Sequence, residues 1–289
     1  MSRLSIIIPA LAGGTPLEET LISVLENRPE GCEVVLACDP SYDDPYELGD
    51  EIEFAIVDQQ DNWMHAANVG LQHTTSEFVH LMLPGMRATS GWFDAAVDTL
   101  ESEGDTTAAI VPRVVFDASE PECCGLGFTP GGRLIDVSNR DLAQRRVAVH
   151  AAFPGSGVYR QDDLLRIGGW EESIHPRLAT IEMMTRFYSL GKSAIFDGSC
   201  TLVADSLGQL NGMLNGDASH FMLARDVERL YLKCRMLGCS KSSAHFGTIL
   251  QGVARSIPSG TVFSEVAGRL VGRFGAKRNA APDRNRRAA

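Results

Sequence analysis

Side chains that could do chemistry lie near the ends of predicted strands and helices: Asp39, Asp61, Asn68, Arg87 and Glu182. The guanidinium of Arg87 could bind a phosphate through two parallel hydrogen bonds, in the place of a metal ion. The carboxylate of Glu182 could act as a general base if it reached an acceptor hydroxyl. The carboxylate of Asp61 and the amide of Asn68 could line one crevice with Asp39.

Four of these side chains also fit a purely structural role. Asp39 precedes a proline, and aspartate is common in such turns. Asn68 falls inside a predicted helix, where an asparagine usually serves the structure. Glu182 and Arg186 are four residues apart, which is the spacing of an ion pair on one helix face. Arg87 has the features of an exposed loop arginine. The sequence leaves these alternatives open.

Several common catalytic motifs are absent from the sequence. It has seven cysteines and no C-x-x-C pair, so neither a disulfide framework nor a zinc site is expected. It has no G-x-S-x-G element and no P-loop. The first predicted strand is followed by PALAGG rather than G-x-G-x-x-G, which argues against a dinucleotide-binding oxidoreductase. His65, His73 and His80 lack the spacing of metal ligands, and we expect them to serve local packing or solvent contacts.

The charge of the 289-residue chain is unevenly distributed. It has 26 basic and 37 acidic residues, a formal net charge of −11. The last 24 residues carry seven Lys or Arg and one Asp, so residues 1–265 carry a net charge of −17. So acidic a body should repel nucleic acid. The apolar run 4–12 contains a proline and follows only one positive charge, which favours a buried strand over a secretory signal. We therefore expect a cytoplasmic location.

The first half of the chain alternates predicted strands and helices. The expected strands cover 4–9, 33–37, 54–57, 78–83 and 108–111, and helices are expected over 63–72 and 91–100. This alternation predicts an open, mainly parallel sheet covered on both faces. Ligands bind such sheets beyond the carboxyl ends of the strands. Residues 112–150 predict a loop or hairpin insertion.

Five segments occur in a characteristic order: SIIIPA at 5–10, VVLACDPS at 34–41, AANVGL at 66–71, SEFVHL at 76–81 and a stretch at 157–170 that ends in GGW. This series resembles family-two glycosyltransferases of the GT-A fold, whose members carry A-x-N-x-G-L and G-E-Y-V motifs. The resemblance covers residues 4–205. It implies a GT-A-like α/β domain that binds a nucleotide-diphospho-sugar and transfers the sugar to a glycan or other hydroxyl acceptor.

The resemblance breaks at the metal-binding D-x-D motif of the family. Most members hold Mg²⁺ or Mn²⁺ there, just after the fourth strand, to neutralise the diphosphate. The matching positions are Leu83 and Gly85, whose side chains cannot ligate a hard cation. The late metal-binding histidine of many members falls near Val203. We therefore expect no divalent metal at this motif.

The catalytic-base motif also differs, whereas the donor side is partly kept. The family's Glu-Asp pair has become Ala179 and Thr180, which leaves Glu182 as the candidate catalytic residue, about half a helical turn from the base position. Asp39 matches the family's aspartate that contacts the base and ribose. The candidate donor-binding residues are Pro9, Asp39, Asp61, Asn68 and Arg87.

Two functional hypotheses follow from this pattern. The first is a soluble or peripheral glycosyltransferase that acts without the usual metal. The second is a catalytically inactive GT-A-like binding or scaffolding module in polysaccharide biosynthesis. The loss of three functional positions together favours the second, and the motif series favours the first.

The C-terminal part is predicted to be separate from the GT-A-like domain, which we expect over 1–210. We expect a helical extension over 211–274 and a disordered basic tail over 275–289. Apolar residues recur every four positions in this extension: Val262, Val266, Leu270 and Phe274. A basic amphipathic helix of this kind can lie on an anionic membrane, and the membrane surface expected here is the inner, cytoplasmic face. The alternative is a helix packed against the domain.

Overall fold

The computed structural model divides into two compact units. The first comprises residues 1–127 and 135–216, and the second comprises 128–134 and 217–289. The predicted boundary at residue 210 falls inside helix α6 (Leu207–Asn215), which belongs to the first unit. The structure describes residues 3–10, 15–58, 62–116, 122–129, 132–138, 146–215, 220–237 and 261–279.

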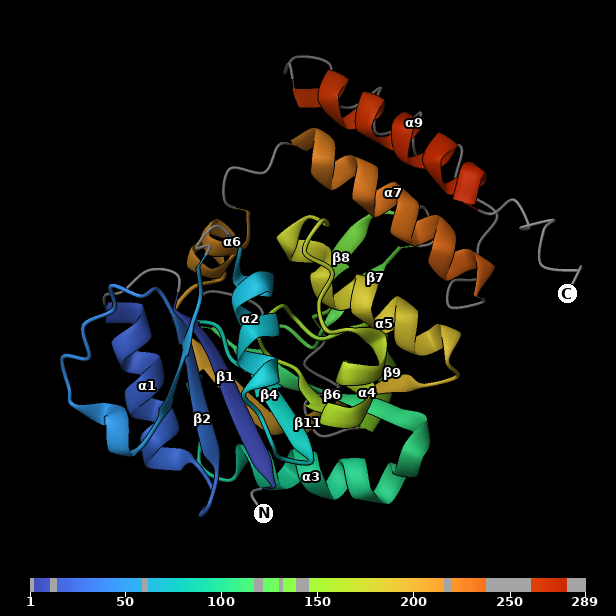
Figure 1. Cartoon of the computed structure of the whole chain (residues 1–289). Helices are drawn as coiled ribbons and strands as arrows, with labels where there is room; N and C mark the ends of the chain where they lie inside the picture. Colours follow the sequence, from blue (N-terminus) through green and yellow to red (C-terminus); the bar gives the residue numbers. More distant parts are fainter. Residues whose placement is uncertain are drawn as a thin grey trace, which may run out of the picture. The chain divides into compact units, whose positions relative to one another are not determined.

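The first unit is built on a twisted sheet flanked by helices (Figure 1). Within the described residues the sheet follows the order β3-β2-β1-β4-β10-β6-β11-β5, and β9 adds to β11. Its strands are β1 (Leu4–Ala10), β2 (Glu33–Cys38), β3 (Glu53–Ile56), β4 (Phe78–Leu81), β5 (Met86–Ala88), β6 (Thr107–Val115), β9 (Arg146–Val149), β10 (Val158–Arg160) and β11 (Ser193–Ala204). A separate hairpin pairs β7 (Leu126–Phe128) with β8 (Leu134–Asp136).

The sheet is mixed rather than mainly parallel. β1, β2, β3 and β4 pair in parallel, and so do β6 and β11. β10 runs antiparallel between β4 and β6, and β5 and β9 are antiparallel to β11. Parallel neighbours need a crossover connection, whereas antiparallel neighbours do not.

Helices follow the strands where the sequence predicts them. Those of the first unit are α1 (Thr15–Asn27), α2 (Trp63–Gln72), α3 (Trp92–Glu103), α4 (Gln161–Ile167), α5 (Ala179–Ser189) and α6, with short 3₁₀ turns η1 (Leu48–Asp50), η2 (Gly104–Thr106) and η4 (Pro176–Leu178). α2 packs closely on β1 because Gly70 has no side chain. A Cβ there would lie 2.6 Å from Cγ2 of Ile7. This contact explains the glycine of the AANVGL segment.

The second unit contains two long helices, α7 (His220–Met236) and α9 (Thr261–Asn279), which pack against each other. Residues 275–279, which the prediction places in the basic tail, belong to α9, and 280–289 lie outside the described residues. Over the part of the chain that the structure describes, no helix combines the length and apolar character needed to cross a membrane.

His80 is a fully buried titratable group at the centre of β4. Its ring lies 4.5 Å from that of Trp92, and neither ring nitrogen has a hydrogen-bond partner. Burial lowers the pKa of His80 from 6.5 to about 3. The imidazole is therefore neutral in the folded protein, while it gains a proton in the unfolded chain below about pH 6.5.

We expect His80 to make the fold sensitive to acid. Between pH 6.5 and 4 the unfolded state binds a proton at His80 that the folded state does not, so stability should fall by up to about 1.4 kcal/mol per pH unit. Above pH 6.5 both states are neutral and the effect disappears. Urea denaturation of the protein and of His80→Leu as a function of pH measures this slope. Equal slopes in the two proteins would contradict the assignment.

Candidate functional site

The strand order reverses at the β1/β4 pair, and the candidate site lies beyond the carboxyl ends of these strands. β2 and β3 lie on one side of β1, and β4 lies on the other, all parallel. Connections leave such a pair in opposite directions and open a crevice there. Met82 N donates to Ile7 O at 2.9 Å, and two residues further the buried Pro9 offers no N–H. Pro9 pairs in register with Ala37 of β2.

Asp39 directly follows β2 at this edge of the sheet. Its carboxylate accepts hydrogen bonds from the backbone N–H of Ser41, at 2.7 Å, and from the Ser41 hydroxyl. The Tyr42 N–H bonds to the Asp39 carbonyl at 2.9 Å. Asp39 thus organises its own turn. Its side chain is partly exposed, at the place where the donor-binding prediction puts it.

Asp61 lies outside the described residues, but its neighbour Asn62 begins α2. The Asn62 Oδ1 accepts from Met64 N at 2.9 Å and so caps the helix. The Asn62 Nδ2 donates to the Glu172 carbonyl at 3.1 Å. The start of α2 is thereby tied to the loop that follows α4.

Asn68 holds the same loop from the middle of α2. Its Oδ1 accepts from Trp170 N at 2.8 Å, and its Nδ2 donates to the Trp170 carbonyl and to Glu172 Oε1, both at 2.8 Å. Gly169 has a φ of +71°, and a Cβ there would collide with the Asn68 amide. The asparagine of the AANVGL segment therefore binds the GGW segment in the folded chain.

The two positions that match the D-x-D motif are buried and lack carboxylates. Leu83 is 2% exposed, and it packs on the bare backbone of Gly155, where any Cβ would collide with it. Gly85 has a φ of +90°, and its N–H donates to Thr20 Oγ1 at 2.9 Å. Cδ2 of Leu210 lies 3.5 Å from the place of a Cβ on Gly85. This part of the sheet edge is filled by apolar groups.

A divalent metal does not fit these residues. A hard cation requires oxygen ligands, and the side chains at this place are aliphatic or absent. Among the described residues, no group of three or more His, Cys, Asp or Glu side chains could hold a metal ion. Charge compensation for a phosphate group would therefore have to come from arginine or backbone N–H groups.

Arg87 of β5 is held between two carboxylates. Its Nη1 donates to Glu19 Oε2 at 2.8 Å and its Nη2 to Asp205 Oδ1 at 2.5 Å. The bond to Asp205 is the largest cause of a raised pKa of the Arg87 guanidinium. The backbone partner of Arg87 on β11 is Val203, the position of the family's late histidine. A phosphate that bound Arg87 would share the guanidinium with these two carboxylates or replace one of them.

Glu182 lies in the first turn of α5 and is 9% exposed. Its Oε2 is 2.7 Å from Nη2 and 2.8 Å from Nε of Arg186. Arg186 also donates to the carbonyls of Ile167 and Gly169, each at 2.7 Å. Glu182 thus orients an arginine that joins α5 to the C-terminal end of α4.

The positions of the missing Glu-Asp pair are also occupied by structural contacts. Ala179 and Thr180 are fully buried, and the Thr180 hydroxyl donates to the Ala152 carbonyl at 2.8 Å. Ala152 precedes Gly155 by three residues. The start of α5 is therefore connected through one short loop to the Leu83 contact.

A second ion pair near the start of α5 was not anticipated from the sequence. Arg177 Nη2 lies 3.0 and 3.2 Å from the two carboxylate oxygens of Asp136, and each side chain is about one-quarter exposed or less. The buried His175 accepts from Arg177 N at 3.2 Å through Nδ1. Asp136 and Arg177 are 41 residues apart, so no local spacing links them. The proline that follows His175 is the one feature of the local sequence that indicates the 3₁₀ turn carrying Arg177.

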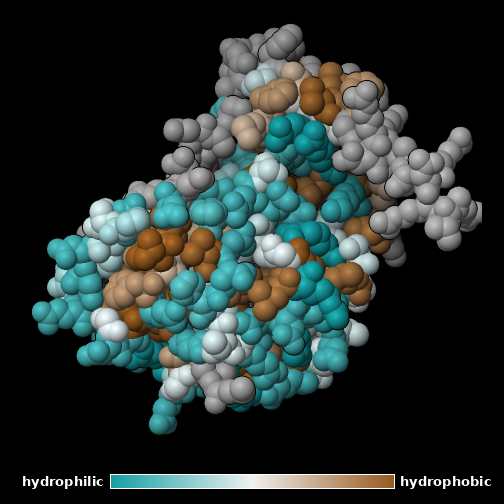
Figure 2. Space-filling model, viewed as in Figure 1, coloured by the Kyte–Doolittle hydropathy of each residue, from teal (hydrophilic) through white to brown (hydrophobic). Residues whose placement is uncertain are grey.

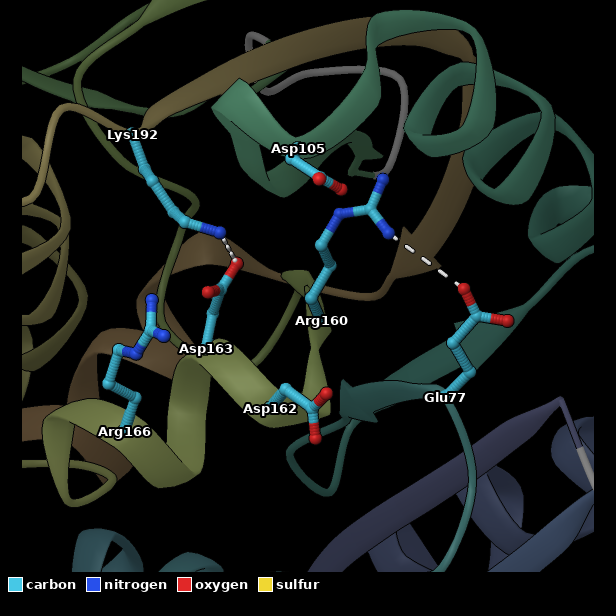
Figure 3. A pocket seen from close by; sticks show the side chains of 7 residues that line it. All are labelled: Glu77, Asp105, Arg160, Asp162, Asp163, Arg166 and Lys192. Carbon is cyan, nitrogen blue, oxygen red and sulfur yellow. Dashed lines mark hydrogen bonds and ion pairs between the residues drawn. The ribbon is translucent and has the colours of Figure 1, made fainter.

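A charged cavity of about 610 Å³ lies at the opposite edge of the sheet (Figure 3). Its wall is formed near the amino ends of β4, β6 and β11, and its charges are largely paired. Lys192 Nζ is 2.5 Å from Asp163 Oδ2, and Arg160 donates to the Leu100 and Thr107 carbonyls at 2.6 and 3.1 Å. The cavity is therefore separate from the predicted site. It is lined by Glu77, Asp105, Arg160, Asp162, Asp163, Arg166 and Lys192.

Comparison with known proteins shows similarity in structure but not in sequence. No protein-family model matches the chain, and no curated protein sequence matches it. Among solved structures, the chain is similar to GalNAc-T7 with UDP, GalNAc and Mn²⁺, with a TM-score of 0.58 and 13% identity. That match covers 89% of this chain and 58% of the other.

Two further structures match almost the whole chain. The mannosyltransferase PcManGT from Pyrobaculum calidifontis, in complex with GDP-Man and Mn²⁺, has a TM-score of 0.54 and 14% identity, over 96% of this chain and 88% of that chain. S. aureus TarS 1-349 has a TM-score of 0.51 and 12% identity, over 96% and 73%. The GT-A-like fold predicted from the motif series is thus confirmed: the chain has the fold of these glycosyltransferases.

We expect Asn68→Ala to destabilise the protein by about 2–3 kcal/mol, because the N–H and C=O of Trp170 would lose their partner. Asn27→Ala is a matched control, since the Asn27 amide makes one 2.8 Å bond to the Ser23 carbonyl of its own helix. Its cost should be about 1 kcal/mol or less. Urea denaturation measures both, and equal losses would contradict the role of Asn68.

Proposed function

We propose that this protein binds a nucleoside diphosphate sugar beyond the carboxyl ends of β1 and β2 and transfers the sugar to a hydroxyl of a glycan acceptor. Asp39 would contact the base and ribose, beside Pro9, Asp61 and Asn68. Arg87 would supply positive charge to the diphosphate by exchanging a carboxylate partner for phosphate. The reaction would proceed without a divalent metal at the D-x-D positions.

The observation that carries this proposal is the extent of the structural similarity. The match to a mannosyltransferase in complex with GDP-Man spans 96% of the chain. The partial exposure of Asp39 next to the β1/β4 crevice supports the same conclusion. Ligands of open α/β sheets bind at this place for reasons of topology.

The partners and location are proposals of the same kind. We propose a nucleotide sugar and a glycan as ligands, no nucleic acid, and a cytoplasmic protein at the inner face of a membrane. The acidity of the chain supports the exclusion of nucleic acid. The absence of disulfides among the described cysteines is compatible with a reducing compartment.

Calorimetric titration with UDP, GDP and dTDP sugars tests donor binding. We expect one of them to bind, with an affinity that changes less than about twofold when Mn²⁺ replaces EDTA, because the metal ligands are missing. Asp39→Asn should weaken this binding by about tenfold, the size of one lost charged hydrogen bond.

Asp98→Asn, on the exposed face of α3, is the matched control and should bind as the unchanged protein does. The absence of binding with every donor, with and without Mn²⁺, would contradict the proposal. A strong requirement for Mn²⁺ would contradict its metal-free form.

A second candidate function is a catalytically inactive GT-A-like module that binds or scaffolds partners in polysaccharide biosynthesis. Specific contacts favour it: Leu83 and Thr180 are buried at the metal and base positions, and the carboxylate of Glu182 is bound by Arg186. A general base must be able to accept a proton from the acceptor. An ion-paired carboxylate that is 9% exposed can do so only if Arg186 moves away.

Donor turnover by the purified protein separates the two functions. If Glu182 is the base, Glu182→Gln abolishes sugar release at unchanged thermal stability. If it is a structural partner, Glu182→Gln and Arg186→Gln each lower stability by about 1–3 kcal/mol, and the double variant costs little more than either. Turnover that survives Glu182→Gln would exclude this residue as the base, and no turnover with any donor would favour the inactive module.

A further inference from the structure

The two units differ sharply in charge. By sequence, the first unit has 12 basic and 32 acidic residues, a net charge of −20. The second has 14 basic and five acidic residues, a net charge of +9. A unit with so large a positive excess is attracted to anionic surfaces, and the acidic unit is repelled by them.

Gly268 and Gly272 bring the backbone of helix α9 close to that of α7. A Cβ on Gly268 would collide with the Phe221 carbonyl, and one on Gly272 with the Arg225 carbonyl. These two residues are four apart, so they share one face of α9. The backbones of the two helices therefore approach closely, and the contact uses none of the larger apolar residues on the far side of α9.

The larger apolar residues of α9 remain in contact with solvent. Leu270 and Phe274 follow the two glycines by two positions, a rotation of about 200°, which puts them on the opposite face. Leu270 is 51% exposed, Val271 47% and Phe274 67%. Apolar side chains accordingly come to the surface along α9 in Figure 2. Packing on α7 thus does not explain the apolar character of Leu270 and Phe274.

Basic residues accompany this apolar face. Arg269 and Arg273 lie in the same turns, and Arg269 is close to Glu265 at 3.2 Å and to the buried Glu228 at 3.8 Å. The sequence continues with Lys277, Arg278 and three further arginines of the last ten residues. Exposed Phe and Leu beside Lys and Arg are typical of helices that lie in the headgroup region of a bilayer.

We propose that α9 docks the protein on an anionic lipid bilayer, with Leu270, Val271 and Phe274 inserted among the headgroups and the basic residues near the lipid phosphates. Each Lys or Arg near such a surface adds to the attraction, which salt weakens. The proposal concerns the second unit alone and does not require that the first unit bind a nucleotide sugar.

Co-sedimentation of the full chain with vesicles, without nucleotide, tests this docking. The probes are vesicles of phosphatidylcholine alone and vesicles that contain about one-third phosphatidylglycerol. We expect binding to the anionic vesicles at low salt, at least about tenfold weaker binding to the neutral ones, and progressive loss as salt is raised. Equal binding to both vesicle types would overturn the proposal.

Single substitutions at exposed positions keep the test independent of folding. Phe274→Ser and, separately, Leu270→Ser should each weaken vesicle binding by about tenfold, since each removes a large apolar group from the interface. Ile22→Ser is the matched control, because Ile22 is 56% exposed on α1 of the acidic unit. It should change binding by less than about twofold, within the range of surface substitutions.

Sedimentation equilibrium of the same variants distinguishes lipid from a second copy of the chain. If Phe274→Ser lowers self-association and leaves vesicle binding unchanged, α9 is an interface between copies and the lipid proposal is wrong. If neither property changes in either variant, the proposal is also wrong. Circular dichroism confirms that the variants keep the helical content of the unchanged protein.

Discussion

The contact between Leu83 and Gly155 determines what the carboxyl end of the sheet can hold. An aliphatic side chain rests there on bare backbone, so neither of the two D-x-D positions, Leu83 and Gly85, carries a carboxylate that could bind a divalent cation. A diphosphate placed there would need another source of positive charge. Two guanidinium groups are already engaged in ion pairs, that of Arg87 with two carboxylates and that of Arg177 with Asp136. An anionic ligand that bound either arginine would share it with these carboxylates.

The residues that could do chemistry also hold the elements of the fold together. Asn68 binds the loop after α4, Glu182 orients an arginine that reaches the end of α4, and Asp39 closes its own turn. These contacts are satisfied hydrogen bonds of ordinary length, and partly buried groups of this kind are costly to leave unpaired. Such a residue can bind a ligand without loss of stability only if the ligand replaces the hydrogen bonds that the residue makes within the protein.

The second unit follows a different physical logic from the first. Its two long helices approach through glycines, and Leu270, Val271 and Phe274 of α9 remain largely exposed. Close backbone packing can replace side-chain interdigitation, because dispersion contacts between backbones are then numerous. An exposed apolar row next to a high positive charge requires a surface outside the helix pair, and charge complementarity selects an anionic one.

The sequence by itself determined the alternation of strands and helices and the span of α2, since hydrophobic periodicity and capping residues are local signals. It also determined the family-like order of the motifs, which can be read directly from the residues. It also showed that Leu83 and Gly85 cannot bind a metal. The tertiary structure decided which polar groups are already engaged. Arg177 binds Asp136, which lies 41 residues earlier in the chain. β10 lies antiparallel between β4 and β6, although it follows both of them in the sequence. Such partners are set by packing between distant segments, which no local spacing records.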